Sequence, residues 1–304
     1  MEVNSIALLF PGQGSQRVGM GKDLATNFAV AKQVFNRVDD ALAFNLSSLI
    51  FDGETEELNK TSNAQPAIMA VSMAYFEVLK SLGLVDLNEV KFMAGHSLGE
   101  YSALCAAGVI TLEDTAKLLK ARGSYMMQAC IDNPGTMAAL IGLDFDKVKA
   151  IADQSMCYVG NSNSPAQIVL SGSVDTVEKA CEIAKEQGAK RAIILPVSGA
   201  FHSPLMQSAA DNMLAIIEQT KFAVPNFKVI SNLTAKEYSD TAEIKDLLVK
   251  QITNTVKWQE SVVYMAESGA NKFVEVGFGN VLSGLVKKIL PEASVTTSED
   301  SLKA

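Results

Sequence analysis

Two residues far apart in the chain are the main candidates for chemistry, a serine and a histidine. Ser97 stands at the centre of a Gly-x-Ser-x-Gly pattern, residues 95–99, between an apolar run that predicts a strand and a segment that predicts a helix. The two glycines allow a turn too tight for a β-carbon and leave the hydroxyl exposed at its apex. The peptide N–H of Leu98, at the start of the helix, is free to stabilise an oxyanion that develops on a carbonyl. The pattern therefore predicts a nucleophilic serine.

A serine hydroxyl is a weak nucleophile near neutral pH and needs a base. The chain offers two histidines, His96 and His202. His96 is adjacent to Ser97, and neighbouring side chains diverge at such a turn, so we expect it to pack under the turn. His202 follows a predicted strand and precedes a predicted helix, which suits a base, so we expect His202 to take the serine proton. Acids that lie between the pair, and that stay open as a third, orienting member, are Asp144, Asp146 and Asp175.

A glycine-rich loop, residues 11–16, follows the first predicted strand. The dinucleotide fingerprint fails because Arg17 stands at the third glycine position, and the Walker pattern fails because Met20 and Gly21 replace its lysine and hydroxyl residue. The loop is therefore either a tight turn or a backbone cradle for an anion, and its spacing alone favours the turn.

Two charged residues lie near the serine in chain order. Arg122 is close to the end of a helix that begins at Thr111 with the capping pattern Ser/Thr-x-x-acid and runs towards Gly123. Its position alone favours complementing the helix dipole over clamping a substrate carboxylate. Glu100 lies in the first turn of the helix after Ser97, where we expect it to complement that helix rather than to be catalytic.

The elements that position these residues alternate between strand and helix. Outside residues 135–197 we expect strands at 6–10, 90–94, 227–231 and 272–276, and helices at 98–107, 111–122, 204–219, near 247 and near 262. Within 135–197 we expect strands at 137–141, near 158, at 167–170 and at 191–195, helices at 145–152 and 174–187, and a loop at 161–165. The order β-α-β-β-α-β predicts a ferredoxin-like unit. We expect a discontinuous large α/β subdomain, 1–124 with 198–304, and a small inserted subdomain, 125–197.

Composition sets limits on the class of protein. With 304 residues, 48% hydrophobic and 20% charged, the chain is long enough for about two globular domains, and disorder is excluded for most of it. A net charge of −8 argues against nucleic acid as a main partner.

Scattered cysteines and short apolar runs limit the compartment. Four cysteines without a C-x-x-C pair, and only two histidines, predict no metal site and a reducing compartment, so we expect a cytoplasmic protein. The most apolar stretch, 64–76, is too short to cross a bilayer, and residues 1–16 lack the charge of a signal peptide. We therefore expect no membrane association.

Taken together, the motifs resemble those of the malonyl-CoA:acyl carrier protein transacylase family, the acyltransferases of type II fatty acid synthesis. The resemblance extends from end to end of the chain. The segments that carry it are FPGQGSQ (10–16), GHSLGEY (95–101), RG (122–123), NSP (163–165), HSPLM (202–206) and EVG (275–277). It implies a hydrolase-like α/β core with a short parallel sheet and a nucleophile elbow, plus the ferredoxin-like insertion.

The resemblance also implies roles for individual residues. Ser97 and His202 form a dyad in which a main-chain carbonyl, at the position matched by Gln251, orients the imidazole in place of an acid. The backbone N–H groups of Gln13 and Leu98 form the oxyanion hole, and Gln13 also contacts the substrate.

A ping-pong reaction is implied as well. Ser97 takes a malonyl group from malonyl-CoA, coenzyme A leaves, and the phosphopantetheine thiol of acyl carrier protein accepts the group, with no cofactor. Arg122 holds the malonyl carboxylate, which reverses the expectation from its position alone. One departure from the family is Phe278, which follows Gly277 where relatives usually have proline.

Two other functions stay open on the sequence. A serine hydrolase, thioesterase or esterase, would use the same dyad with water as acceptor, and a carrier-binding scaffold would need no chemistry, although intact Ser97 and His202 argue against it. Because acyl carrier proteins are acidic and this chain is acidic on average, docking requires a local basic patch. The contributors that we expect are the doublets Lys190–Arg191 and Lys287–Lys288; otherwise these are solvated surface charges.

Overall fold

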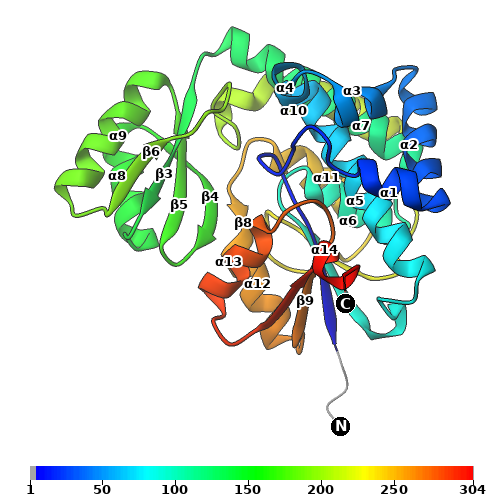
Figure 1. Ribbon diagram of the computed structural model, residues 1–304. Coiled ribbons are helices and arrows are strands. Elements are labelled where there is room, and N and C mark those ends of the chain that lie inside the picture. The colour runs from blue at the N-terminus through cyan, green and yellow to red at the C-terminus, as the bar shows by residue number, and fades with distance from the viewer. Residues whose placement is uncertain (1–4, 304) are drawn as a thin grey trace.

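The structure, a computed structural model, describes residues 5–303. Within them the chain forms two five-stranded sheets, one in each of two lobes that lie side by side (Figure 1). The first sheet is parallel throughout, in the order β10-β9-β1-β2-β7. Its strands are β1 (Ile6–Phe10), β2 (Val90–Gly95), β7 (Lys228–Ile230), β9 (Lys272–Glu275) and β10 (Ser294–Thr297).

Strand β1 lies in the middle of this sheet and is buried along its whole length. A strand that is covered by helices on both faces is apolar at nearly every position. In β1, alternate side chains pack into two different hydrophobic cores. Leu8 and Phe10 pack with α2 (Ala29–Leu42), α5 (Thr61–Ser81) and α7 (Leu112–Asp132). Leu9 faces α12 (Trp258–Glu267) and α13 (Val281–Ile289).

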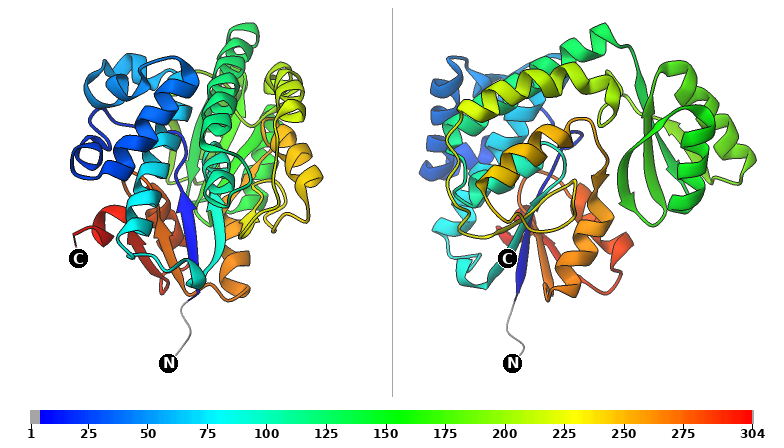
Figure 2. Two further views of the ribbon diagram at one scale, coloured as in Figure 1. Left: turned by 90° about the vertical axis from the view of Figure 1, so that its right-hand side faces the viewer. Right: turned by 180° about the vertical axis from the view of Figure 1, so that it is seen from behind.

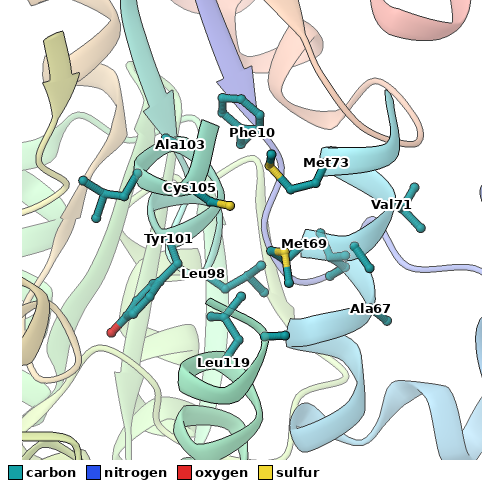
Figure 3. Packing of buried hydrophobic residues seen from close by; sticks show 14 of the residues in the cluster. Phe10, Ala67, Met69, Val71, Met73, Leu98, Tyr101, Ala103, Cys105 and Leu119 are labelled. Atoms are coloured by element: carbon teal, nitrogen blue, oxygen red, sulfur yellow. The ribbon is translucent and has the colours of Figure 1, made fainter. Parts of the chain in front are cut away.

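Helix α5 is buried along most of its length and lies in the hydrophobic core of the larger lobe. Its Met69 and Met73 lie across from Leu98 and Cys105, at the start and near the end of the serine's helix (Figure 3). All four cysteines of the chain are buried and none forms a disulfide. The helix that follows Ser97 therefore packs against a buried apolar layer.

The second sheet has the strand order of a ferredoxin-like unit with one strand added. Its order is β6-β3-β5-β4-β8, and the first four strands pair antiparallel in the arrangement expected for β-α-β-β-α-β. The elements are β3 (Thr136–Ile141), α8 (Phe145–Ser155), β4 (Tyr158–Ser164), β5 (Gln167–Gly172), α9 (Val174–Glu186), β6 (Arg191–Ile194) and β8 (Val256–Lys257). The predicted fold class is confirmed.

Helices join the two lobes and complete the larger one. Helix α7 leads from the larger lobe to β3, and α10 (Gln207–Gln219) runs alongside it on the return (Figure 2). The other helices are α1 (Lys22–Asn27), α3 (Leu46–Asp52), α4 (Thr55–Asn59), α6 (Gly99–Ala106), α11 (Thr241–Gln251) and α14 (Ser298–Ser301), with single turns η1 (Leu87–Glu89) and η2 (Pro204–Met206). Among residues 5–303, no helix combines the length and the apolar character needed to cross a membrane.

Two predicted boundaries were wrong. The helix that begins at Leu112 does not end near Gly123 but continues to Asp132. Gly123 lies where α7 crosses α5, and a Cβ there would lie 2.4 Å from the carbonyl oxygen of Thr61, so this glycine permits a close crossing and does not end the helix. The expected loop at 161–165 is mostly strand, because β4 gains a partner on its second side from β8, about ninety residues later in the chain. The division of the chain at 124/125 and 197/198 stays a prediction, and α7 crosses the first of these boundaries.

Candidate active site

Ser97 lies in a sharp turn between β2 and α6. Its backbone φ is 55°, in the left-handed region that residues other than glycine rarely adopt. Gly95 approaches Gly99 so closely that a Cβ on Gly95 would lie 1.9 Å from the Gly99 carbonyl. The predicted strand, turn and helix are therefore present, and the turn holds the serine side chain away from its own helix.

The glycine-rich loop after β1 lies against this turn. The N–H of His96 donates to the carbonyl of Phe10 over 3.0 Å, which ties the end of β1 to the residue before the serine. Within residues 5–303, neither the N–H of Gln13 nor that of Leu98 donates to a protein acceptor. Two free peptide donors on adjoining loops are what an oxyanion hole requires.

His202 contacts Ser97 although 105 positions separate the two residues. The Ser97 hydroxyl donates to Nε2 of His202 over 2.8 Å. The Nδ1–H of the same ring donates to the main-chain oxygen of Gln251 over 2.9 Å. Because Nδ1 carries the proton, Nε2 is free to accept one, so this carbonyl selects the tautomer that a base needs.

The aspartates that the sequence left open lie elsewhere. Asp144 is the N-cap of α8, Asp146 lies in the first turn of that helix, and Asp175 lies in the first turn of α9. The orienting partner of the imidazole is therefore a backbone carbonyl, which the residue types in the sequence could not indicate.

Burial keeps the imidazole neutral. Desolvation, reinforced by the positive charge of Arg122, lowers the pKa of His202 to about 3. A histidine that stays unprotonated at neutral pH can act as a general base towards Ser97.

Arg122 is fully buried and points at the nucleophile. It donates from Nη2 to Ser97 Oγ over 3.2 Å and to Gln251 Oε1 over 2.8 Å. From Nη1 it donates to Gln65 Oε1 over 2.8 Å. A guanidinium carries five N–H donors, so donors remain for a bound carboxylate. No acid within the described part of the chain forms an ion pair with this cation. The sequence placed Arg122 in the last turn of its helix, which favoured a role at the helix end. Because α7 continues to Asp132, Arg122 lies in the middle of the helix instead.

A cleft of about 330 Å³ opens where the two lobes meet, and Gln13 and His96 lie in its wall. The imidazole Nε2–H of His96 donates to Oδ1 of Asn163 on β4 over 2.8 Å, which joins the lobes. His96 therefore lines the cleft and does not pack under the turn, contrary to expectation. Adjacent side chains at the turn do diverge, but the divergence directs His96 towards the smaller lobe.

Two residues near the serine were missed from the sequence, Gln65 and Asn232. Gln65 on α5 accepts from Arg122, as described above. The Oδ1 of Asn232 accepts from the N–H of Ser97 over 2.7 Å, and its Nδ2 donates to the carbonyl of Gly95 over 2.7 Å. Asn232 follows β7, the neighbour of β2, so its place at the carboxyl edge of a parallel sheet was a usable signal. No comparable signal pointed to Gln65.

Comparison with known proteins places this geometry in a family. The family model for the acyl transferase domain matches residues 7–302. The malonyl CoA-acyl carrier protein transacylase of Bacillus subtilis is 44% identical over 292 residues, which cover 94% of this chain and 91% of the relative. The chain belongs to the malonyl CoA-acyl carrier protein transacylase family.

Solved structures of this family superpose closely on the chain. An acyl-carrier-protein S-malonyltransferase from Bartonella henselae is 46% identical, with a TM-score of 0.94 over 98% of each chain. A malonyl-transacylase in complex with its type II PKS acyl-carrier protein is 40% identical, with a TM-score of 0.92 over 97% of this chain and 96% of that one. The family resemblance that the motifs predicted is confirmed.

Proposed function

We propose that this transacylase-family chain moves a malonyl group from malonyl-CoA to the phosphopantetheine thiol of an acyl carrier protein, through a malonyl-serine intermediate. The observation that carries the proposal is the contact of Ser97 with both a neutral imidazole, at 2.8 Å, and a guanidinium, at 3.2 Å. The first contact suits a nucleophile, and the second suits an acyl group that ends in a carboxylate.

In the first half-reaction His202 Nε2 takes the hydroxyl proton while Oγ of Ser97 attacks the thioester carbonyl. We propose that the tetrahedral oxyanion accepts hydrogen bonds from the N–H groups of Gln13 and Leu98, because neither group has a protein acceptor within residues 5–303. The C–S bond then breaks, and the imidazolium returns its proton to the departing thiolate of coenzyme A. The product is malonyl-Ser97 with a neutral His202.

The second half-reaction repeats these steps with sulfur as the nucleophile. His202 takes the proton of the carrier thiol, the thiolate attacks the malonyl-serine ester, and the C–O bond to Ser97 breaks. The serine oxygen recovers the proton from the imidazolium, so the site returns to its initial state.

We propose Arg122 as the residue that selects the acyl group. A planar guanidinium binds a carboxylate with two parallel hydrogen bonds, whereas a neutral acyl tail leaves the buried charge without a direct partner. Gln251 and Gln65 hold the guanidinium through its other donors, which leaves its orientation fixed before substrate binds.

We propose that the carrier protein docks over the mouth of the cleft, where Lys288 of α13 is part of the wall.

We also propose a cytoplasmic location, because the four cysteines are scattered in the sequence, as is typical of proteins in a reducing compartment.

The test is a transfer assay with malonyl-CoA, with and without a carrier protein that bears phosphopantetheine. We expect malonyl-carrier as the product, and little loss of malonyl-CoA when carrier is absent. Rapid release of free malonate without carrier would instead identify a hydrolase, and absence of any reaction would identify a non-catalytic scaffold.

A further inference from the structure

A buried acid lies behind the active site and takes no part in the reaction steps above. Glu100, in the first turn of α6, is 1% exposed. Its Oε1 accepts from the N–H of Asn232 over 3.1 Å and from the hydroxyl of Tyr238, and its Oε2 accepts from Nε2 of Gln251 over 2.5 Å. The expectation that Glu100 serves the helix N-terminus explains none of these contacts.

Gln251 connects this acid to the reacting groups. The amide Nε2 of Gln251 donates to Glu100 and also to the carbonyl of Ser97 over 2.9 Å, whereas its Oε1 accepts from Arg122 over 2.8 Å. An ionised carboxylate only accepts hydrogen bonds, so the NH₂ end of the amide must face Glu100. The oxygen end is then directed at the guanidinium.

The charges fit the same arrangement. Arg122 is buried without an acid in direct contact, and a buried cation needs compensation. The carboxylate of Glu100 attracts Arg122 electrostatically from the far side of the amide. Because Gln251 separates the two charges, the guanidinium is compensated while its donors towards Ser97 stay available.

We propose that Glu100 is a positioning residue for acyl-group selection: it fixes the orientation of the Gln251 amide and so holds Arg122, charged and unpaired, beside Ser97. The inference rests on the proposed transfer of a malonyl group. Replacement of Glu100 should therefore impair the reaction with malonyl substrates more than it impairs the reactivity of the Ser97–His202 dyad. The reason is that the carbonyl that orients His202 belongs to the backbone of Gln251, not to its side-chain amide.

The first test replaces Glu100 with glutamine. A glutamine at 100 can donate as well as accept, so the Gln251 amide is no longer fixed and the countercharge is removed. At pH 8 we expect the ratio of kcat/KM for malonyl-CoA to that for acetyl-CoA to fall at least tenfold in Glu100→Gln. The rate at which a fluorophosphonate labels Ser97 should stay within threefold of the wild type, because that probe carries no carboxylate.

Glu275→Gln is the matched control. Glu275 is also a fully buried glutamate, but it accepts from the N–H groups of Leu282 and Ser283 at the start of α13, away from Arg122. Its replacement should leave the malonyl-to-acetyl ratio within twofold. An unchanged ratio in Glu100→Gln, or an equal loss in both variants, would overturn the proposal.

A second test needs no variant. Burial raises the pKa of Glu100 to about 7. The titratable and charged groups that interact with it are Tyr238, Tyr101 and Arg122. Neither tyrosine titrates between pH 5.5 and 8.5, since burial raises the pKa of Tyr238 well above 10 and that of Tyr101 to about 12. Arg122 remains charged throughout.

A protonated Glu100 can donate to Gln251 and carries no countercharge. The malonyl-to-acetyl ratio of the wild type should therefore rise with pH through about 7, and the rise should be absent from Glu100→Gln. A ratio that does not vary with pH in the wild type would contradict the positioning role. Failure of the wild type to transfer malonyl at any pH would instead refute the proposed function itself.

Discussion

The guanidinium of Arg122 donates to the hydroxyl oxygen of Ser97 over 3.2 Å, so the group proposed to recognise the acyl tail touches the nucleophile before any substrate binds. The same oxygen donates its proton towards His202. A cation at this distance favours the serine alkoxide as it forms, because opposite charges attract strongly where water is excluded. Acylation of Ser97 turns this oxygen into an ester oxygen, which is a weaker acceptor, so the donor becomes available to the malonyl carboxylate.

Removal of the guanidinium should abolish acyl selectivity. Two hydrogen bonds to a charged group contribute about 1.5–3 kcal/mol each, so Arg122→Ala should lower kcat/KM for malonyl-CoA by about 10²- to 10⁴-fold. Arg122→Lys should recover little, since an ammonium lacks the planar fork. Steady-state rates with malonyl-CoA and acetyl-CoA check this, and an unchanged ratio of the two in Arg122→Ala would rule out the assignment.

The crossing of α7 over α5 should not accept a methyl group. Alanine in place of Gly123 improves helix propensity by about 1 kcal/mol. However, its Cβ would lie 2.4 Å from Thr61 O and 2.6 Å from Ser62 Cα, which are backbone atoms that cannot turn aside. Overpacking costs about 1–3 kcal/mol, so Gly123→Ala should be destabilised on balance.

Gly284 in α13 is the control for that substitution. A Cβ at Gly284 would have no neighbouring atom within 4 Å, so Gly284→Ala should be neutral or stabilising by up to about 1 kcal/mol. Urea unfolding of the two variants measures the contrast. A stabilised Gly123→Ala protein would show that the helix crossing is looser than described.

Two buried groups should shift stability with pH in opposite directions. The pKa of Glu100 is raised from 4.5 to about 7, so the stability linked to its protonated form is fully present below pH 4.5 and is lost as pH rises through 7. The pKa of His202 is lowered from 6.5 to about 3, so the stability linked to its neutral form is present above pH 6.5 and is lost as pH falls towards 3.

Comparison of Glu100→Gln with the wild type isolates the first effect. From pH 5 to pH 8 the wild type should lose unfolding free energy relative to Glu100→Gln, by an amount on the order of 3 kcal/mol. Urea titrations at several pH values measure it. A difference that stays constant over this range would contradict the raised pKa of Glu100.

The two basic doublets should differ in their effect on the carrier protein. Lys288 lines the cleft, whereas Lys190 and Arg191 lie at the outer edge strand β6 of the smaller lobe. Charge reversal at Lys287 and Lys288 should lower kcat/KM for the carrier about tenfold at low salt, with the effect shrinking as salt screens the charges.

Reversal at Lys190 and Arg191 should have a smaller effect, about twofold. Rates measured against carrier concentration at saturating malonyl-CoA check both doublets. Unaltered transfer after reversal at all four positions would refute a basic docking surface in these regions.

Much of the fold and the dyad could be predicted because local chemistry specifies them. The turn at Ser97 needs glycines at 95 and 99, and the chain has only two histidines, so the base was a choice between two residues. The strand order of the smaller lobe followed from its β-α-β-β-α-β sequence.

The rest depends on contacts between distant segments. Gln65 and Gln251 meet at Arg122 from helices that are 186 positions apart in sequence, and neither residue type signals a role. From the sequence, Glu100 was expected only to complement the start of its helix, because a sequence does not show that Tyr238 and Asn232 donate hydrogen bonds to it. Strand β4 extended further than predicted for the same reason, since its second partner comes from residues 256–257.

The most direct test is the mass of the enzyme after brief incubation with malonyl-CoA alone, followed by mapping of the modified peptide. We expect one malonyl group per chain, on Ser97, absent from Ser97→Ala, stable in buffer and discharged by addition of phosphopantetheine-bearing carrier protein. A malonyl group on another residue, or the same transfer rate in Ser97→Ala, would show that Ser97 is not the nucleophile.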